Sequence, residues 1–304
     1  MTAQDNSPSV HTMDRILFGD NQFFGVNHMS EEKARQQLMR FKDTQAIIDV
    51  LDVAYDLGIR TFMCTTHDRV GEICDHMRAN PDRYRDFIYY PCMPYAHKYA
   101  NSVSEVGVLQ TISRFSSGGV LSTLYRGAVG AITKDIYELM KLLVDAEMKR
   151  FQGLNTPVIF VQNVVTDLLL GLKLHDTLAE FHAYIRQRYN AEAGFITMNL
   201  PRLLDALDSV GVENPIVCSN INKIDFRMCG GVEMYEKTIR ERRFRPIAMS
   251  VFASGAIPAE EALDYVCQQR KIESIVFGAS SRGNIKQTKE IIERLDARYA
   301  AIAA

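Results

Sequence analysis

Side chains that can move a proton follow the first three apolar, β-rich segments of the chain. An imidazole changes its charge near neutral pH, and His67 has the carboxyl group of Asp68 beside it. His67 is therefore the first choice for an acid–base group, although capping of the following helix explains it equally well. Ordinary turn chemistry is likewise an alternative explanation for Asp20. The candidate catalytic residues are Asp20, His67, Asp68 and Tyr95.

Neutral and small polar side chains follow several of the same segments. Amides provide fixed donors and acceptors without charge, which suits an uncharged or zwitterionic ligand. The predicted partner is therefore a small polar molecule. The residues expected to contact it are Asn21, His28, Cys64 and Asn163.

Three histidines follow successive segments and raise the question of a metal site. His28, His67 and His97 could converge on an ion, with Asp20 or Cys64 completing the shell. No pair has the close ligand spacing of a motif such as HExxH. We therefore predict no metal.

Cysteine and lysine residues near the segment ends have ordinary explanations. Cys64, Cys92 and Cys218 fall late in apolar segments, where cysteine usually fills buried space. Lys98 and Lys223 are candidates for a Schiff base, but both lie in loops, where a solvated lysine is expected.

Apolar β-rich segments alternate with helical patterns along the whole chain. Such alternation is typical of parallel βα units, and eight of them predict a closed (β/α)8 TIM barrel over residues 1–304 as a single domain. An open doubly wound sheet is the alternative, but its GxGxxG fingerprint is missing. The eight strand candidates begin near residues 15, 60, 87, 157, 194, 214, 245 and 272.

A long insertion separates the third and fourth strand candidates. Residues 97–155 contain a predicted helix at 136–150 and the Gly/Ser-rich piece SSGGVLSTLYRGAVG. We interpret this insertion as a lid or an oligomer contact, with an extra helical hairpin as the alternative. Elsewhere, helices are expected at 44–57 and 174–189, and a loop is expected at 20–40.

Composition excludes several classes of protein. A hydrophobic content of 47% and a charged content of 24% are ordinary for a globular chain with a large core. A net charge of −2 gives no electrostatic footprint for nucleic acid or an anionic membrane. Six cysteines without a CxxC pair, and an N-terminus without a signal-peptide pattern, favour a cytoplasmic protein. A homo-oligomer is compatible with the sequence.

The loop GASSRGN before the last helix predicts a phosphate site. Small residues let backbone N–H groups approach an anion at a helix N-terminus, and Arg282 adds a positive charge. Good helix-capping residues explain the same loop without a ligand.

The C-terminal half resembles the aldo-keto reductase family. ITMNLPRLLDAL, PIVCSNIN, PIAMSVFASGAI and SIVFGASSRGNIKQT are similar to the fifth to eighth strands of that family and the segments that follow them. The resemblance implies NADP(H) as a cofactor, with Asn199 and Asn220 on the nicotinamide carboxamide. It assigns the phosphate-bearing part of the cofactor to Ser250, Ser254, Gly255, Gly278, Ala279, Ser280, Ser281 and Arg282.

The catalytic tetrad of that family does not carry over to this sequence. Carbonyl reduction needs a proton donor tuned by neighbouring charges, and such a donor would have to be rebuilt here from other residues. The tetrad positions correspond to Met63 or Cys64, Asp68, Cys92 and Asn163, and the ring-stacking aromatic position holds Met249.

Three functions fit these observations. The first is an enzyme on an aldo-keto-reductase-like barrel that acts on a small polar molecule by lyase, isomerase or hydrolase chemistry. The second is an NADP(H)-dependent oxidoreductase with a rebuilt proton donor such as His67, Tyr95 or Asp20. The third is a non-catalytic sensor or subunit, which the many polar groups at the strand ends disfavour because unpaired buried amides cost about 1–3 kcal/mol each.

Overall fold

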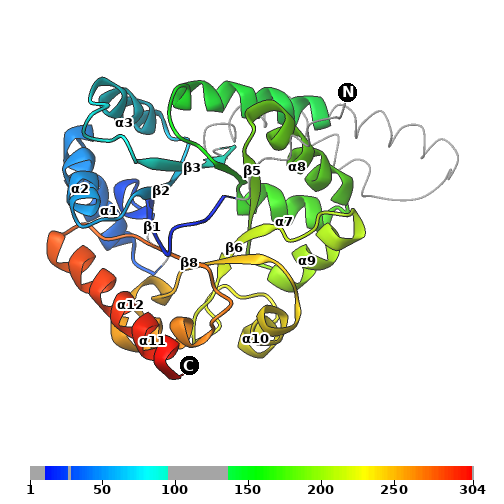
Figure 1. The fold of residues 1–304 in the computed structure, drawn as a ribbon. Helices are drawn as coiled ribbons and strands as arrows, with labels where there is room; N and C mark the ends of the chain where they lie inside the picture. Colours follow the sequence, from blue (N-terminus) through cyan, green and yellow to red (C-terminus); the bar gives the residue numbers. More distant parts are fainter. Residues whose placement is uncertain (1–10, 27–28, 95–135, 303–304) are drawn as a thin grey trace, which may run out of the picture.

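Eight parallel strands form a closed barrel in which the strands follow one another in sequence order (Figure 1). The structure is a computed structural model that describes residues 11–26, 29–94 and 136–302. Pairing of Ile16 with Ile275 brings the last strand against the first and closes the barrel, which confirms the predicted TIM barrel and rules out an open sheet. The strands are β1 (Ile16–Gly19), β2 (Thr61–Thr65), β3 (Ile88–Met93), β4 (Val158–Val161), β5 (Glu192–Thr197), β6 (Ile216–Asn220), β7 (Arg245–Met249) and β8 (Ser274–Phe277).

Helices between the strands form the outer ring of the barrel (Figure 1). Residues 136–148 are also helical. The named α-helices are α1 (Glu31–Arg40), α2 (Thr44–Asp56), α3 (Asp68–Ala79), α7 (Asn163–Gly171), α8 (His175–Tyr189), α9 (Leu200–Ser209), α10 (Gly231–Glu241), α11 (Ala259–Gln268) and α12 (Arg282–Ile302). Short 3-10 helices are η1 (Asn21–Phe23), η2 (Lys149–Phe151) and η3 (Ala253–Gly255).

Side chains alternate between the barrel interior and the layer beneath the helices, as the pleat of a strand requires. Leu17, Tyr90 and Phe160 are fully buried in the interior cluster. A Cβ atom on Gly194 would lie 2.2 Å from the ring of Phe160, so only glycine leaves room for that ring. Burying each large apolar side chain contributes about 1.5–3 kcal/mol, and the filled interior restricts ligands to the ends of the barrel.

Two helices differ from the expectation from sequence. Residues 20–40, expected as a loop, contain η1 and α1, and α1 begins after Ser30, whose hydroxyl accepts a hydrogen bond from the N–H of Lys33. Helix α7 was also not predicted. By contrast, α2 begins and ends within one residue of its predicted limits, with Asp43 as its cap.

The described part of the predicted insertion belongs to the ring of helices. Val144, Met148 and Phe151 are buried in the main core, and Tyr184 of α8 donates a hydrogen bond to Asp145 at 2.7 Å. Residues 136–151 therefore occupy the layer that a βα unit requires between β3 and β4. The remainder, 97–135, lies outside the described residues, so the lid or oligomer contact stays a prediction.

An ion-pair network around the buried Arg245 lies at the amino-terminal end of the barrel. Arg245 of β7 is 3.0 Å from a carboxylate oxygen of Glu192 and 3.1 Å from one of Glu273. It also donates a hydrogen bond to the carbonyl oxygen of His11, and the His11 ring is 2.9 Å from the hydroxyl of Tyr90. TIM-barrel active sites lie at the opposite end of the barrel, so we interpret this network as one that stabilises the fold.

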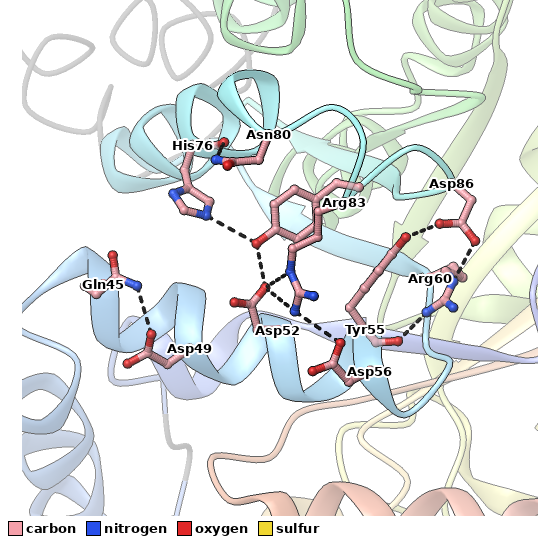
Figure 2. Close-up of polar contacts among 11 residues, drawn as sticks. Gln45, Asp49, Asp52, Tyr55, Asp56, Arg60, His76, Asn80, Arg83 and Asp86 are labelled. Carbon is pink, nitrogen blue, oxygen red and sulfur yellow. Dashed lines mark hydrogen bonds and ion pairs between the residues drawn. The ribbon is translucent and has the colours of Figure 1, made fainter.

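A polar network joins α2, α3 and the loop before β3 on the outside of the barrel (Figure 2). The hydroxyl of Tyr84 donates to Asp52 at 2.6 Å and is 3.2 Å from the ring of His76. Figure 2 shows Arg83 reaching from this loop toward Asp52 and Asp56 of α2. The network fixes how the two helices lie against the strand that follows them.

None of the helices within the described ranges has the length and apolar character needed to cross a membrane.

Candidate functional site

Asp20 lies directly after β1 at the carboxyl-terminal mouth of the barrel. One of its carboxylate oxygens accepts two hydrogen bonds from Thr65, one from the backbone N–H at 2.7 Å and one from the hydroxyl at 2.6 Å. The side chain is buried, and burial raises its pKa above the ordinary value even though the Thr65 hydrogen bonds lower it. Asn21 follows it as the first, exposed residue of η1. Asp20 is thus a buried carboxyl group that holds its proton more strongly than a surface aspartate.

His67 acts as the N-cap of α3 in the structure. Its Nδ1 atom accepts a hydrogen bond from the N–H of Arg69 at 3.2 Å, and its ring stacks on Phe24 with centroids 4.2 Å apart. Burial lowers the pKa of this imidazole, assisted by the charge of Arg69. These contacts are those of the capping alternative, and the catalytic assignment of His67 stays a prediction.

Two residues that sequence inspection missed fix the turn between β2 and α3. Arg150 donates hydrogen bonds to the carbonyl oxygens of Thr66 and His67 at 2.7 and 2.8 Å, and it lies 3.6 Å from Asp68. Glu147, which is almost fully buried, accepts a hydrogen bond from the hydroxyl of Thr66. Asp68 itself is exposed at the start of α3 and lies near Arg150, and its catalytic assignment stays a prediction.

The buried cysteines near the mouth are protonated thiols. Cys64 is fully buried in the layer beneath the helices, and Cys92 is buried inside the barrel. Burial raises the pKa of both thiols well above the ordinary value, with the charge of Asp20 as a second cause. A thiol in this state is a poor nucleophile. Cys64 therefore contributes no exposed atom for a substrate to contact.

Asn199 and Asn220, predicted to hold a carboxamide, are engaged with neighbouring backbone. The side chain of Asn199 caps α9 by accepting a hydrogen bond from the N–H of Arg202 at 3.4 Å. The amide nitrogen of Asn220 donates to the carbonyl oxygen of Arg227 at 2.8 Å. Among the described residues each amide makes one such contact, and an amide has four hydrogen-bonding positions. Both side chains retain capacity for a ligand.

Asp167 of α7 supports the turn that carries Asn199. It accepts a hydrogen bond from the hydroxyl of Thr197 at 2.5 Å and another from the N–H of Met198 at 3.1 Å. Burial raises its pKa. Asn163, predicted to contact substrate, is the first residue of the same helix and is half-buried. No sequence motif marks Asp167, because its partners lie about thirty residues away on β5.

The loop after β7 has an unusual backbone. Ser250, Ala253 and Ser254 have φ values of 53°, 46° and 59°, and Gly255 has a φ of 92°. Residues other than glycine pay of order 1–3 kcal/mol for such a conformation, which concentrates at functional sites. Two of the predicted cofactor residues, Ser250 and Ser254, are among them. The loop after β7 therefore contains a left-handed backbone conformation at the positions predicted to contact the cofactor.

The loop after β8 combines small residues with two arginines. Ser281 caps α12 by accepting a hydrogen bond from the N–H of Asn284 at 3.3 Å, and Arg282 is exposed in the first turn of that helix. Arg40, at the end of α1, donates hydrogen bonds to the hydroxyl and the carbonyl oxygen of Ser280. Gly278 lies against Gln22, whose Oε1 atom would be 2.0 Å from a Cβ there. Arg40 thus adds a second positive charge that the sequence motif did not reveal.

Tyr95 and His28 lie outside the described residues, as does His97. In the part of the chain that the structure describes, no three histidine, cysteine, aspartate or glutamate side chains are grouped so that they could hold a metal ion.

Neither a protein-family model nor a protein of curated function matches the chain. Solved structures do. A candidate aldo-keto reductase from Pseudomonas aeruginosa aligns over 93% of this chain and 90% of its own, with a TM-score of 0.55 and 13% sequence identity. The chain has the aldo-keto reductase fold. A candidate 2,5-diketo-D-gluconic acid reductase B aligns over 93% and 86% with a TM-score of 0.54 and 9% identity. An aldo/keto reductase from Brucella melitensis aligns over 94% of both chains with a TM-score of 0.51 and 10% identity.

The positions that the sequence resemblance assigns to the reductase tetrad hold no lysine or imidazole group, and the carboxyl group among them, that of Asp68, is exposed. Met63 and Cys92 are buried in the barrel interior, and Asn163 is a neutral amide. The buried carboxyl group of Asp20 lies close to two of these positions. Asp20 follows Gly19, which pairs with Met63, and it is hydrogen-bonded to Thr65, which pairs with Cys92.

Proposed function

We propose that this chain is an enzyme that converts a small polar molecule at the carboxyl-terminal mouth of the barrel, with Asp20 as its acid–base group. One observation carries the proposal: a carboxyl group is buried at the end of β1, is held by two hydrogen bonds from Thr65, and has a raised pKa. A carboxyl group whose pKa is raised by burial is a better proton donor to a substrate than an ordinary surface aspartate, and this suits it to acid–base catalysis. Buried carboxyl groups of this kind mark functional sites.

The reaction class that fits is proton transfer without the reductase tetrad. As a carboxylate, Asp20 takes a proton from a carbon atom next to a carbonyl group. It then returns that proton to another atom of the same molecule, which is an isomerisation, or to a departing hydroxyl group, which leaves as water in an elimination. The substrate oxygen that gains charge needs hydrogen-bond donors. Asn199 and Asn220, at the ends of β5 and β6, are the proposed donors.

The β8–α12 loop is proposed to bind a phosphate group of the substrate or of a cofactor. Ser280, Ser281 and Arg282 lie at the amino-terminal end of α12, where backbone N–H groups and the helix dipole favour an anion. Arg40 supports the same loop from α1.

A conversion screen tests the role of Asp20. The wild-type protein is incubated with a library of small polar metabolites, and loss or gain of each compound is followed by mass spectrometry. The Asp20→Asn variant keeps an oxygen that can accept both Thr65 hydrogen bonds but cannot exchange a proton. Loss of general acid–base catalysis lowers the rate by about 10²- to 10⁴-fold. Asp82→Asn changes an exposed aspartate and is the matched control. Equal conversion by Asp20→Asn and wild type would disprove the assignment.

The alternative is an NADP(H)-dependent oxidoreductase. The left-handed backbone at Ser250 and Ser254 and the arginines around the β8–α12 loop support it. Titration with NADPH, followed by nicotinamide fluorescence and thermal shift, distinguishes the two candidates. Cofactor at 100 times its Kd stabilises the fold by about 2.7 kcal/mol. Such a shift would favour the oxidoreductase, and an absent shift at millimolar NADPH would favour chemistry without this cofactor.

A further inference from the structure

A groove on the outside of the barrel lies between α3 and the segment that begins with η2. Its volume is about 410 Å³, and it is lined by Gly71, Asp75, Arg78, Lys149, Arg150 and Gln152. Ligand pockets for small molecules have volumes of about 300–1,000 Å³. The short helix η2 packs against α3.

The groove carries an excess of positive charge. Three of its lining residues, Arg78, Lys149 and Arg150, are cations, and only Asp75 is an anion. Asp75 pairs with Arg78. Lys149 is exposed and has no carboxylate within ion-pairing distance in the described part of the chain. Arg150 lies 3.6 Å from Asp68, which is outside the lining, so a bound anion would be neutralised mainly by Lys149.

The cationic side chains are held in place by backbone contacts. The Arg78 guanidinium donates hydrogen bonds to the carbonyl oxygens of Arg150 at 2.5 Å and Gln152 at 3.1 Å. Arg150 is anchored by the carbonyl oxygens of Thr66 and His67. Preorganised side chains lose less entropy when a ligand binds, so this groove differs from a patch of freely moving surface lysines.

Gly71 leaves part of the groove open. A Cβ atom there would meet no other atom within 4 Å. Glycine inside a helix costs about 0.5–1 kcal/mol relative to alanine, and its φ is not in the left-handed region, so the backbone of α3 does not require it. The missing side chain therefore costs helix stability and leaves the groove unobstructed.

We propose that this groove binds the phosphate dianion of a small molecule, independently of the barrel mouth. A phosphate group carries about −1.5 to −2 charge at pH 7, and the lining has an excess of cations over anions to attract it. Lys149 contributes an ammonium group without an ion-pair partner among the described residues, and Arg78 has N–H donors beyond those bound to backbone and to Asp75.

Equilibrium dialysis against radiolabelled inorganic phosphate tests the proposal at constant ionic strength. Glucose 6-phosphate as competitor distinguishes a phosphate ester from free phosphate, and acetate is the monoanion control. Gly71→Glu places a carboxylate in the groove, and Lys149→Ala removes the free cation. The matched controls are Gly71→Ala, whose methyl group meets no other atom within 4 Å, and Lys237→Ala, which removes an exposed lysine on α10.

Saturable binding is expected in the wild type, with affinity about fivefold or more weaker in Gly71→Glu and Lys149→Ala, as the loss of one charge-assisted contact implies. The two control variants should stay within about twofold of the wild type. Absence of saturable binding, or equal binding by Gly71→Glu and Gly71→Ala, would overturn the proposal. Binding that is lost in Arg282→Ala but kept in Gly71→Glu would place phosphate at the β8–α12 loop instead and would also overturn it.

Discussion

Thr65 donates two hydrogen bonds to a single carboxylate oxygen of Asp20, from its backbone N–H and from its hydroxyl group. The contact joins the ends of β1 and β2 and fixes the orientation of the carboxyl group. The other carboxylate oxygen accepts no hydrogen bond from Thr65. Two opposed effects act on Asp20. Burial favours the neutral acid, and the hydrogen bonds favour the carboxylate, with burial the larger.

The stability of the Asp20→Asn variant should exceed that of the wild type near neutral pH. The pKa of Asp20 is raised in the folded state, so the folded protein binds more protons than the unfolded chain between the two pKa values. The associated stability is present below the unfolded pKa and is lost as the pH rises through the folded pKa. Asparagine does not ionise, so the variant does not lose this stability as the pH rises. Chemical denaturation between pH 3 and pH 8 measures the free energy of unfolding of both proteins.

The stability difference should grow with pH and then level off, and each kcal/mol gained raises the Tm by roughly 2–4 °C in a chain of this size. Asp82→Asn, at an exposed position, should show no such trend. A wild type that is more stable than Asp20→Asn throughout this pH range would contradict the expected effect of burial.

The Thr65→Val variant should raise the pKa of Asp20 further. Valine has nearly the same shape but lacks the hydroxyl donor, so only the backbone hydrogen bond still favours the carboxylate. Thr65→Ser retains a hydroxyl group and should leave the titration almost unchanged. The pH dependence of unfolding, measured relative to Asp20→Asn in each background, separates the two variants. Identical behaviour of valine and serine would show that the hydroxyl contact is not maintained in solution.

The Arg282→Ala variant should bind inorganic pyrophosphate about tenfold more weakly, because one charge-assisted hydrogen bond is worth about 1.5–3 kcal/mol. Arg40→Ala should weaken binding as well, since Arg40 supports Ser280 of the same loop. Isothermal titration calorimetry measures both. Lys237→Ala on α10 is the control, and a loss of affinity there equal to that of Arg282→Ala would indicate general electrostatic attraction rather than a site.

The Arg245→Ala variant should lose about 1.5–3 kcal/mol of stability, because its buried guanidinium donates charge-assisted hydrogen bonds to Glu192 and Glu273, which are themselves 25% and 39% exposed. Arg242 also bridges two carboxylates, but its side chain is 32% exposed, compared with 7% for Arg245. Arg242→Ala should therefore cost roughly 1 kcal/mol or less. Urea denaturation compares the two, and equal losses would contradict the importance of burial.

The fold was predictable because its signals are local and repeated. Strand β8 and its neighbours are short apolar runs bounded by small residues, and α2 has apolar residues at helical spacing with Asp43 before it. Helix α1 lacked that signal. The segment EEKARQQLMR has few apolar residues and no apolar stripe at helical spacing, and accordingly none of its residues is buried.

The site was less predictable because its contacts join distant parts of the chain. Arg40 and Ser280 are 240 positions apart, and Glu147 meets Thr66 across 81 positions. A second reason why the site was hard to predict is that His67 and Asn199 are equally suited to capping a helix and to binding a ligand. Residue type alone does not tell which partner an imidazole or an amide will find.

Titration of the Asp20 carboxyl group by carbon-13 NMR tests the central claim most directly, and it needs no knowledge of the substrate. The signal that disappears in Asp20→Asn identifies the residue. The account predicts a carboxyl group that keeps its proton to a pH above the usual aspartate value of about 3.9. A signal that titrates at or below that value would show a fully solvated or strongly paired carboxylate, and it would contradict the role proposed for Asp20.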